Sequence, residues 1–485
     1  MHELHQRGAP IEGLHQSVVV WAPSELTLNG LTAALQALLD QHAALRIRLQ
    51  RDGSSDWSLE ILPPGSVRAD ALVRRVDIAA VADCEVADVL RRETSSAVSA
   101  LRPEAGLMLQ VVWCDAGERA LGRLLLVAHH LSVDGVSWRI MTADLASAWA
   151  DVVMGREPAL APVGTSFRSW ATALDAAAHD PERTAELALW QKTLKSPSPL
   201  SPPTRTHETA SAAGVRRTVL PKDTTRDLIT AVTEAFHADM NDVLLTALGL
   251  AVADWRREQG QAVPGYNHVL VDLERHGREE QVVPGSDLSR TVGWFTSMHP
   301  VRLNLGNVDW RDVWAGGPEI GRVLKNVKEQ VRDVPDHGIG YGLLRYLDEE
   351  TGQALAELPT PPIVLNYLGR TPTAESARPT AWTVVPDEGD GNSGHETDRV
   401  SRTIEIDALV RNTADGPEMV AYWAFDRGLI SDAAVRRIID GWLRALTALV
   451  TCTKESNAGG RTPSDLDLIS LTQEDIENLE MEWGL

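Results

Sequence analysis

The segment from Arg123 to Trp149 constrains the fold of this chain more than any other. Its first residues, Arg123–Ala128, form a short apolar run of the length expected for a buried strand. Its last residues, Trp138–Trp149, place apolar side chains at helical spacing. His129 and His130 therefore lie on the turn between a predicted strand and a predicted helix, where a rigid scaffold can hold a side chain in a fixed direction. The segment indicates an α/β fold.

The turn is a candidate catalytic site, because histidine is the side chain best suited to proton transfer near neutral pH. A histidine pair considered alone is more often structural than catalytic, so the surrounding pattern has to decide. Asp134 and Gly135 follow in the order His-His-x-x-x-Asp-Gly. An aspartate beside a glycine in a tight turn is more typical of a residue that fixes the loop than of one that reacts.

The α/β pattern continues on both sides of this segment. Asn29 is the expected N-cap of an early helix with leucines on one face. Residues 111–114 and 123–128 are predicted to pair as a hairpin. A second α/β region is expected beyond residue 214, with a helix near residues 223–236.

The length of 485 residues is too great for one hydrophobic core. Residues 195–214 are rich in proline and serine and lack periodicity, which is typical of an extended linker. We therefore predict an N-terminal lobe at residues 1–194 and a C-terminal lobe at residues 215–485. Residues 371–400 are predicted to form a surface loop.

The composition excludes several classes of function. A formal net charge of -22, with no basic run, disfavours nucleic acid and anionic membrane as partners. The spacing of the three cysteines indicates neither a disulfide framework nor a zinc site. No apolar segment has the length of a membrane span or of the core of a signal peptide, so a cytoplasmic protein is expected.

Residues 269–279 (VLVDLERHGRE) place a carboxylate, a histidine and two arginines at the end of a second apolar strand. A solvated run of charges is the ordinary explanation of such a pattern. A carboxylate beside Arg275 and Arg278 is expected to stay ionised, which makes Glu274 a candidate base.

Six motifs in a fixed order resemble those of the epimerization domains of nonribosomal peptide synthetases, a branch of the condensation-domain superfamily. The first is HHLSVDGVSW, whose Ser-Trp ending is similar to the epimerizing branch. A single match of this kind arises by chance, whereas six in order do not. The other five are DVLLTALG at 242–249, ERHGRE at 274–279, RTVGWFTSMHP at 290–300, PDHGIGYG at 335–342 and LNYLG at 365–369.

The resemblance implies a fold and a reaction. The fold would be α/β, with two chloramphenicol-acetyltransferase-like lobes in a V-shaped pseudo-dimer and the active site in the cleft between them. The reaction would be L-to-D epimerization of an aminoacyl or peptidyl thioester held on the phosphopantetheine arm of a carrier protein. Neither a metal nor a cofactor bound by the domain itself is implied. The implied partners are the upstream peptidyl carrier protein domain and neighbouring synthetase domains.

The resemblance also assigns roles to residues. His130 and Glu274 are the expected acid–base pair, because inversion requires a proton to leave one face of the α-carbon and another to arrive at the opposite face. The residues expected to support them are His129, Asp134, Arg278, Asn366 and Tyr367.

Two of these supporting roles are specific. Asp134 is expected to pair with Arg278 and so to bridge the lobes. The enolate oxygen is expected to be stabilised by backbone N–H groups or by the side chain of Asn366 or Tyr367.

Two departures from the family pattern carry further expectations. The opening PIQxWF motif should precede residue 5, so the chain is expected to be clipped at its start, like an excised piece of a larger synthetase. Arg275 stands where the family has a glycine and is expected to narrow or recharge the channel beside Glu274.

Two alternative functions stay open. A condensation domain would use the same fold and His130 to form an amide bond between two carrier-bound substrates. A catalytically silent domain would only dock a partner protein.

Overall fold

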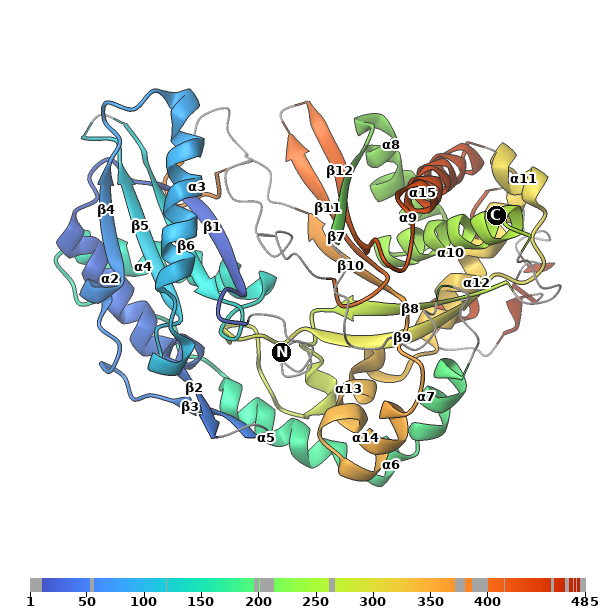
Figure 1. The fold of residues 1–485 in the computed structure, drawn as a ribbon, viewed down its shortest axis with the longest axis horizontal. Coiled ribbons are helices and arrows are strands. Elements are labelled where there is room, and N and C mark those ends of the chain that lie inside the picture. The colour runs from blue at the N-terminus through green and yellow to red at the C-terminus, as the bar shows by residue number, and fades with distance from the viewer. Residues whose placement is uncertain are drawn as a thin grey trace. The chain divides into compact units, whose positions relative to one another are not determined.

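The computed structural model describes residues 11–479 apart from several gaps. It divides into two compact units, each with its own sheet and core, and so confirms the mixed α/β class (Figure 1). In the described part of the chain, no helix is both long enough and apolar enough to cross a bilayer. The residues left out between 11 and 479 are 53–55, 119, 196–199, 201–212, 261–266, 371–379, 386–399, 414, 455–457, 467–470, 474 and 477.

The first unit is built on a four-stranded sheet with a separate two-stranded hairpin. Its strands are β1 (His15–Ala22), β2 (Ile47–Asp52), β3 (Asp56–Ile61), β4 (Val73–Asp77), β5 (Leu109–Asp115) and β6 (Gly122–His129). The order in the sheet is β1-β6-β5-β4, with β4 and β5 parallel and the other neighbours antiparallel. The predicted hairpin of β5 and β6 is confirmed.

Helices cover both faces of this sheet (Figure 1). α2 (Leu28–Gln41) and α4 (Gly135–Val153) lie on one face, and α3 (Asp83–Ala100) lies on the other. Successive side chains of a strand point to opposite faces, so Leu124 packs toward α2 and α4 whereas Leu125 packs toward α3. This double burial explains why Leu124–Ala128 of β6 form an unbroken apolar run.

Two helix starts in this unit can be compared with the sequence expectations. The strand–turn–helix predicted around the histidines is confirmed, since β6 ends at His129 and α4 begins at Gly135. The N-cap predicted for α2 is wrong. Thr27 caps that helix in place of Asn29, because its hydroxyl accepts a hydrogen bond from Gly30 N at 3.1 Å.

The two units differ from the predicted lobes in their boundaries. The first unit comprises residues 1–174, 280–296 and 374–397, and the second comprises the remainder. The first unit is therefore built from three separate segments of the chain. The predicted linker lies largely outside the described residues, so the predicted lobe boundary stays a prediction, and the two compact units divide within α5 (Phe167–Ala178).

The short segment 380–385 shows why late residues belong to the first unit. It lies beside the edge strand β1 and supplies backbone partners to it. Trp382 N donates to Trp21 O at 2.7 Å, and Trp21 N donates to Thr383 O at 2.9 Å. These bonds satisfy backbone groups that an edge strand otherwise exposes. The rest of the loop predicted at 371–400, apart from residue 400 at its end, lies outside the described residues.

The second unit is built on a six-stranded mixed sheet in the order β7-β12-β11-β10-β8-β9. β11, β10 and β8 run parallel to one another, and the other neighbours are antiparallel. In the register of these strands, Leu273 of β8 lies level with Leu365 of β10, and Leu365 lies level with Ile406 of β11. The strands are β7 (Ala213–Leu220), β8 (His268–Arg275), β9 (Ser297–Asn304), β10 (Ile363–Arg370), β11 (Ile404–Thr413) and β12 (Gly416–Asp426).

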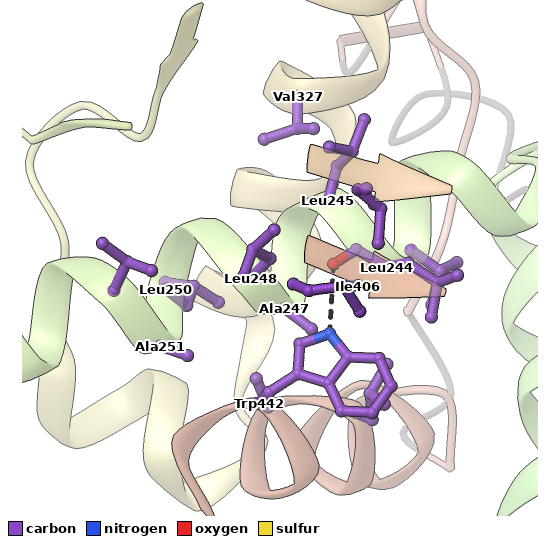
Figure 2. Close-up of a cluster of buried hydrophobic side chains, with 14 of the residues drawn as sticks. Leu244, Leu245, Ala247, Leu248, Leu250, Ala251, Val327, Ile406 and Trp442 are labelled. Carbon is purple, nitrogen blue, oxygen red and sulfur yellow. Dashed lines mark hydrogen bonds between the residues drawn. The ribbon is translucent and has the colours of Figure 1, made fainter. Parts of the chain in front are cut away.

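One face of this sheet is covered by three long helices, α10 (Met240–Glu258), α12 (Pro318–Arg332) and α15 (Asp432–Cys452). Figure 2 shows how α10 supplies a run of buried leucines between α15 and the sheet. The indole of Trp442 donates to Leu244 O at 3.3 Å, so even the polar atom of this large side chain is satisfied. The core of the unit therefore lies on this face.

The opposite face is covered at its β8 end by Trp190 and Leu194, which pack against Leu270. The helix predicted near residues 223–236 is confirmed, although it contains a π turn at Leu228–Val232. The shorter helices of this unit are α6 (Pro181–Thr184), α7 (Leu187–Leu194), α8 (Lys222–Asp227), α9 (Thr233–Ala235), α11 (Trp310–Ala315), α13 (Ile339–Tyr346) and α14 (Glu349–Ala356).

Candidate active site

His130 lies immediately after β6 and is held from both ring nitrogens. Its Nδ1 is 3.0 Å from Val133 O, and a carbonyl oxygen only accepts, so Nδ1 carries the hydrogen. Its Nε2 is 3.1 Å from the amide nitrogen of Gln16 on β1. Burial lowers the pKa of the His130 imidazole below its ordinary value. The ring is therefore neutral at pH 7, with an unprotonated Nε2.

His129 is fully buried and has a different environment. Its Nε2 donates to Ile11 O at 2.9 Å, and its Nδ1 accepts from Leu131 N at 3.2 Å. Burial lowers its pKa to about 4, so it stays neutral across the physiological range. These contacts connect the turn to Ile11, the first residue that the structure describes, and favour a supporting role for His129.

Asp134 is the N-cap of α4 and also holds a distant segment of the same unit. One carboxylate oxygen accepts from the backbone N–H of Ser137 at 2.7 Å, and the other accepts from Phe295 N at 3.2 Å. Ser137 Oγ adds contacts to both Gly293 N and Gly293 O, at 3.1 and 2.9 Å. Asp134 thus anchors residues 293–295 on α4. Its pairing with Arg278 stays a prediction.

The anchored segment places Trp294 against His130, with ring centroids 4.2 Å apart and an interplanar angle of 34°. Gly293 is required beside it, because a Cβ there would lie 2.5 Å from a ring carbon of Phe167. Reasoning from the sequence found the motif that contains Trp294 but gave this side chain no role. It missed Gln16 altogether, since a single glutamine on a strand carries no recognisable signal.

Replacing Asp134 with Ala is expected to destabilise the first unit by about 2–4 kcal/mol, because it removes both a helix cap and the hydrogen bond donated by the buried N–H of Phe295. The measurement is the thermal unfolding midpoint together with hydrogen exchange in α4. Thr27→Ala is the matched control, because it removes only a helix cap. If Asp134→Ala and Thr27→Ala lowered the thermal unfolding midpoint equally, the contact between Asp134 and Phe295 would contribute nothing to stability.

Glu274 is the penultimate residue of β8 in the second unit. Burial, together with the neighbouring carboxylates Asp407 and Glu405, raises its pKa to about 8. The expectation that Glu274 stays ionised is therefore wrong. Desolvation and two like charges outweigh the arginines that follow it in sequence, and the carboxyl group is mostly protonated at pH 7.

That Arg275 narrows or recharges the channel beside Glu274 stays a prediction, and its charge is not among the causes of the raised pKa of Glu274. Adjacent residues of a strand point to opposite faces, so the two side chains leave β8 in opposite directions. The charge of Arg275 acts instead on the buried His299, where burial, Arg275 and His337 lower the imidazole pKa to about 3. Arg278 lies beyond the strand, and its backbone N–H donates to Nδ1 of His276 at 3.0 Å.

Asn366 and Tyr367 lie on β10, between β8 and β11. Tyr367 packs against the core under the long helices, and burial raises its pKa to about 12. Asn366 points to the other face, and its partner in the register is Asp407. Of the two residues predicted to stabilise an enolate, only Asn366 therefore shares a sheet face with Glu274.

The raised pKa of Glu274 predicts a pH-dependent stability. The folded chain holds this proton until about pH 8, whereas the unfolded chain releases it near the ordinary value of 4.5. The favourable contribution of this proton to the free energy of unfolding is complete below pH 4.5 and is lost as the pH rises toward 8. Glu274→Gln is therefore expected to raise the melting temperature relative to the parent chain more at pH 8.5 than at pH 5.

The exposed Glu234, changed to Gln, is the control for this titration. It should show the same difference from the parent chain at both pH values. A Glu274→Gln variant that behaves in the same way would contradict the raised pKa. Melting curves of all three proteins at the two pH values decide the question.

Comparisons with known proteins agree with this architecture. The Condensation domain model matches residues 4–458. A component of the linear gramicidin synthase of Brevibacillus parabrevis is 33% identical over 96% of this chain, and chondramide synthase cmdD of Chondromyces crocatus is 31% identical over 98%. The chain spans only 8% and 11% of the lengths of these relatives.

Solved structures share the fold. The epimerization domain from the third module of tyrocidine synthetase B superposes with a TM-score of 0.73 at 24% identity, covering 93% of this chain and 96% of that one. The first condensation domain of the CDA synthetase superposes with a TM-score of 0.62 at 16% identity, covering 93% and 94%.

The chain belongs to the Condensation domain family, since the family model covers nearly all of it. Domains of this family are catalytic in nonribosomal peptide synthetases. They bind no cofactor of their own and act on substrates carried on the phosphopantetheine of a carrier protein.

Proposed function

We propose that this chain epimerises the α-carbon of an aminoacyl or peptidyl thioester carried by an upstream peptidyl carrier protein domain. The observation that carries the proposal is the pair of complementary protonation states. His130 is neutral with an unprotonated Nε2, and Glu274 is a carboxylic acid with a pKa of about 8. One group is ready to accept a proton and the other to supply one.

In the proposed reaction, His130 Nε2 takes the α-proton, and the electron pair of the Cα–H bond moves into the thioester to form an enolate. The carboxyl group of Glu274 then returns a proton to the opposite face of the α-carbon. The reverse reaction exchanges the two roles, and both need pKa values near the working pH. Asn366 is the proposed donor to the enolate oxygen, because it shares a sheet face with Glu274.

Two further observations support epimerization. The six sequence motifs, including the Ser-Trp ending at Trp138 and the NYLG element, are similar to the epimerizing branch. A solved relative of the same fold is named as an epimerization domain. The proposed setting is a nonribosomal peptide synthetase, in which neighbouring synthetase domains would be further partners.

A condensation domain is the second candidate, because structures named as condensation domains share this fold. It would use His130 to assist the attack of one carrier-bound amine on another carrier-bound thioester. A silent docking domain is the third candidate, and a structure of this fold is described in complex with another protein. The intact His130 and its hydrogen bonds favour catalysis over docking alone.

Incubation of a loaded carrier protein in D2O separates the three candidates. The epimerase is expected to incorporate deuterium at the α-carbon and to give both enantiomers from either one, as read by mass spectrometry and chiral analysis after hydrolysis. A condensation domain would instead give an amide when a second loaded carrier is added. Neither exchange nor amide formation would leave only the docking function.

A further inference from the structure

A chain of three hydrogen bonds passes through the histidine of the candidate site. Trp138, in the first turn of α4, donates its indole N–H to Gln16 Oε1 at 2.9 Å. An indole nitrogen can only donate, so the oxygen of the Gln16 amide must face Trp138. The amide nitrogen of Gln16 then faces His130, 3.1 Å from Nε2.

The two ends of this chain require the same form of the imidazole. An amide NH2 group only donates, so His130 Nε2 must be an acceptor without a proton. At the other side of the ring, Val133 O only accepts, so Nδ1 must carry the hydrogen. The contact with Val133 places a hydrogen on Nδ1, and the contact with Gln16 excludes one from Nε2, so together they select the neutral Nδ1–H tautomer.

The scaffold holds every member of the chain. Gln16 lies on β1, directly paired with Ala128 of β6, two residues before His130. Trp138 is only 8% exposed and packs in the core between α4 and the sheet. The indole therefore has little freedom to release the amide, and the amide has little freedom to turn.

We infer that Gln16, anchored by Trp138, is a positioning residue that keeps His130 as a neutral base with its lone pair on Nε2. Its catalytic consequence rests on the proposed function. A proton on Nε2 of His130 would face the N–H of the Gln16 amide, so two hydrogen-bond donors would oppose each other. A turn of the amide to relieve this would set its NH2 group against the indole N–H. The imidazolium is therefore disfavoured in the resting protein, and an arriving substrate displaces one hydrogen bond to reach an unprotonated nitrogen.

Other titratable groups of the same unit act on this imidazole as well. Asp134, at the start of α4, favours the imidazolium, whereas His15 on β1 opposes it. His129, at the end of β6, is itself affected by His130. None of these groups is changed in the variants described below, so their influence is constant across the comparison.

The test is nitrogen NMR of the full chain labelled with 15N-histidine, in which the signals of His130 are assigned by their loss in His130→Ala. The parent chain is expected to show Nδ1 protonated and Nε2 unprotonated at neutral pH. Gln16→Met keeps the side-chain volume but removes the donor. It is expected to raise the apparent pKa of His130 and to populate the Nε2–H tautomer. Trp138→Phe removes the indole N–H and is expected to shift His130 in the same direction.

Gln36→Met is the matched control. Gln36 is also half-buried in the first unit, but its amide bonds to Asp40 and to Val67 O. It should leave the His130 signals unchanged. Unchanged signals in Gln16→Met, or an Nε2–H tautomer in the parent chain, would overturn the inference. If Trp138→Phe fails to fold, Gln16→Met alone decides.

The kinetic readout separates this inference from the proposed function. Gln16→Met is expected to lower kcat for α-deuterium exchange by about 10–100-fold, the loss seen when a partner that orients a metal-binding histidine is removed, with little change in KM. A parent chain without any exchange would refute epimerization, and the NMR result would still stand. Altered His130 signals with unchanged kcat would refute the catalytic importance of the tautomer.

Discussion

Changing Glu274 to Gln is expected to abolish inversion of a carrier-bound thioester, with a loss of about 10²–10⁴-fold from this one acid–base group. Gln keeps the size of the side chain and its capacity for hydrogen bonds, but it can neither give nor take a proton at working pH. The approach to the D/L equilibrium should fail from both enantiomers, because each direction of the reaction uses both groups.

Deuterium exchange gives a sharper result than inversion. In Glu274→Gln, His130 can still remove and return a proton on its own face of the α-carbon. Exchange with retention is therefore expected from one enantiomer only, and chiral mass spectrometry of substrate recovered from D2O measures it. The enantiomer that still exchanges identifies the face served by His130.

Glu405→Gln is the matched control for the loss of a carboxylate near this position. Glu405 contributes to the raised pKa of Glu274, and its Oε1 accepts from Ser401 N at 2.6 Å, a bond that Gln can keep. This variant should retain inversion, with the pH profile of the rate displaced to lower pH. Full inversion by Glu274→Gln would remove Glu274 from the mechanism.

His130→Ala is expected to have an effect of similar size, about 10²–10⁴-fold on α-proton exchange, because it removes the other acid–base group. The fold should survive, since His130 is half-buried and contributes polar contacts more than packing. Added imidazole is expected to restore part of the exchange by filling the vacated space with an equivalent base.

The exposed His179, changed to Ala, controls for a general effect of losing a histidine. It should match the parent chain in exchange rate and in melting temperature. A His130→Ala variant with near-parental exchange would show that the assignment of His130 is wrong. A variant that is inactive and also unfolded would shift the test to His130→Gln, which keeps a donor near Val133 O.

The local elements around both candidate residues were predictable because they depend on short-range patterns. An apolar run followed by helical periodicity fixed β6 and α4, and the same reasoning placed Glu274 at the end of β8. The N-cap of α2 was mistaken because Thr27 and Asn29 are both good caps, and only the path of the backbone selects between them.

The division into units was not predictable from composition. Residues 280–296 and 380–385 join the first unit through contacts with residues far away in sequence, such as the bond from Phe295 N to Asp134. A linker rich in proline and serine marks a break in periodicity, but it does not tell which segments pack together.

The sequence by itself determined the family pattern, the strand–turn–helix that carries His130, and the position of Glu274 on its strand. Only the tertiary structure decided their chemistry. The protonation state of Glu274 depends on Asp407 and Glu405 from another strand, and the tautomer of His130 depends on Gln16 and Val133. Burial and like charges act through space, and hydrogen-bond partners must be present in three dimensions, so neither can be inferred from neighbours along the chain.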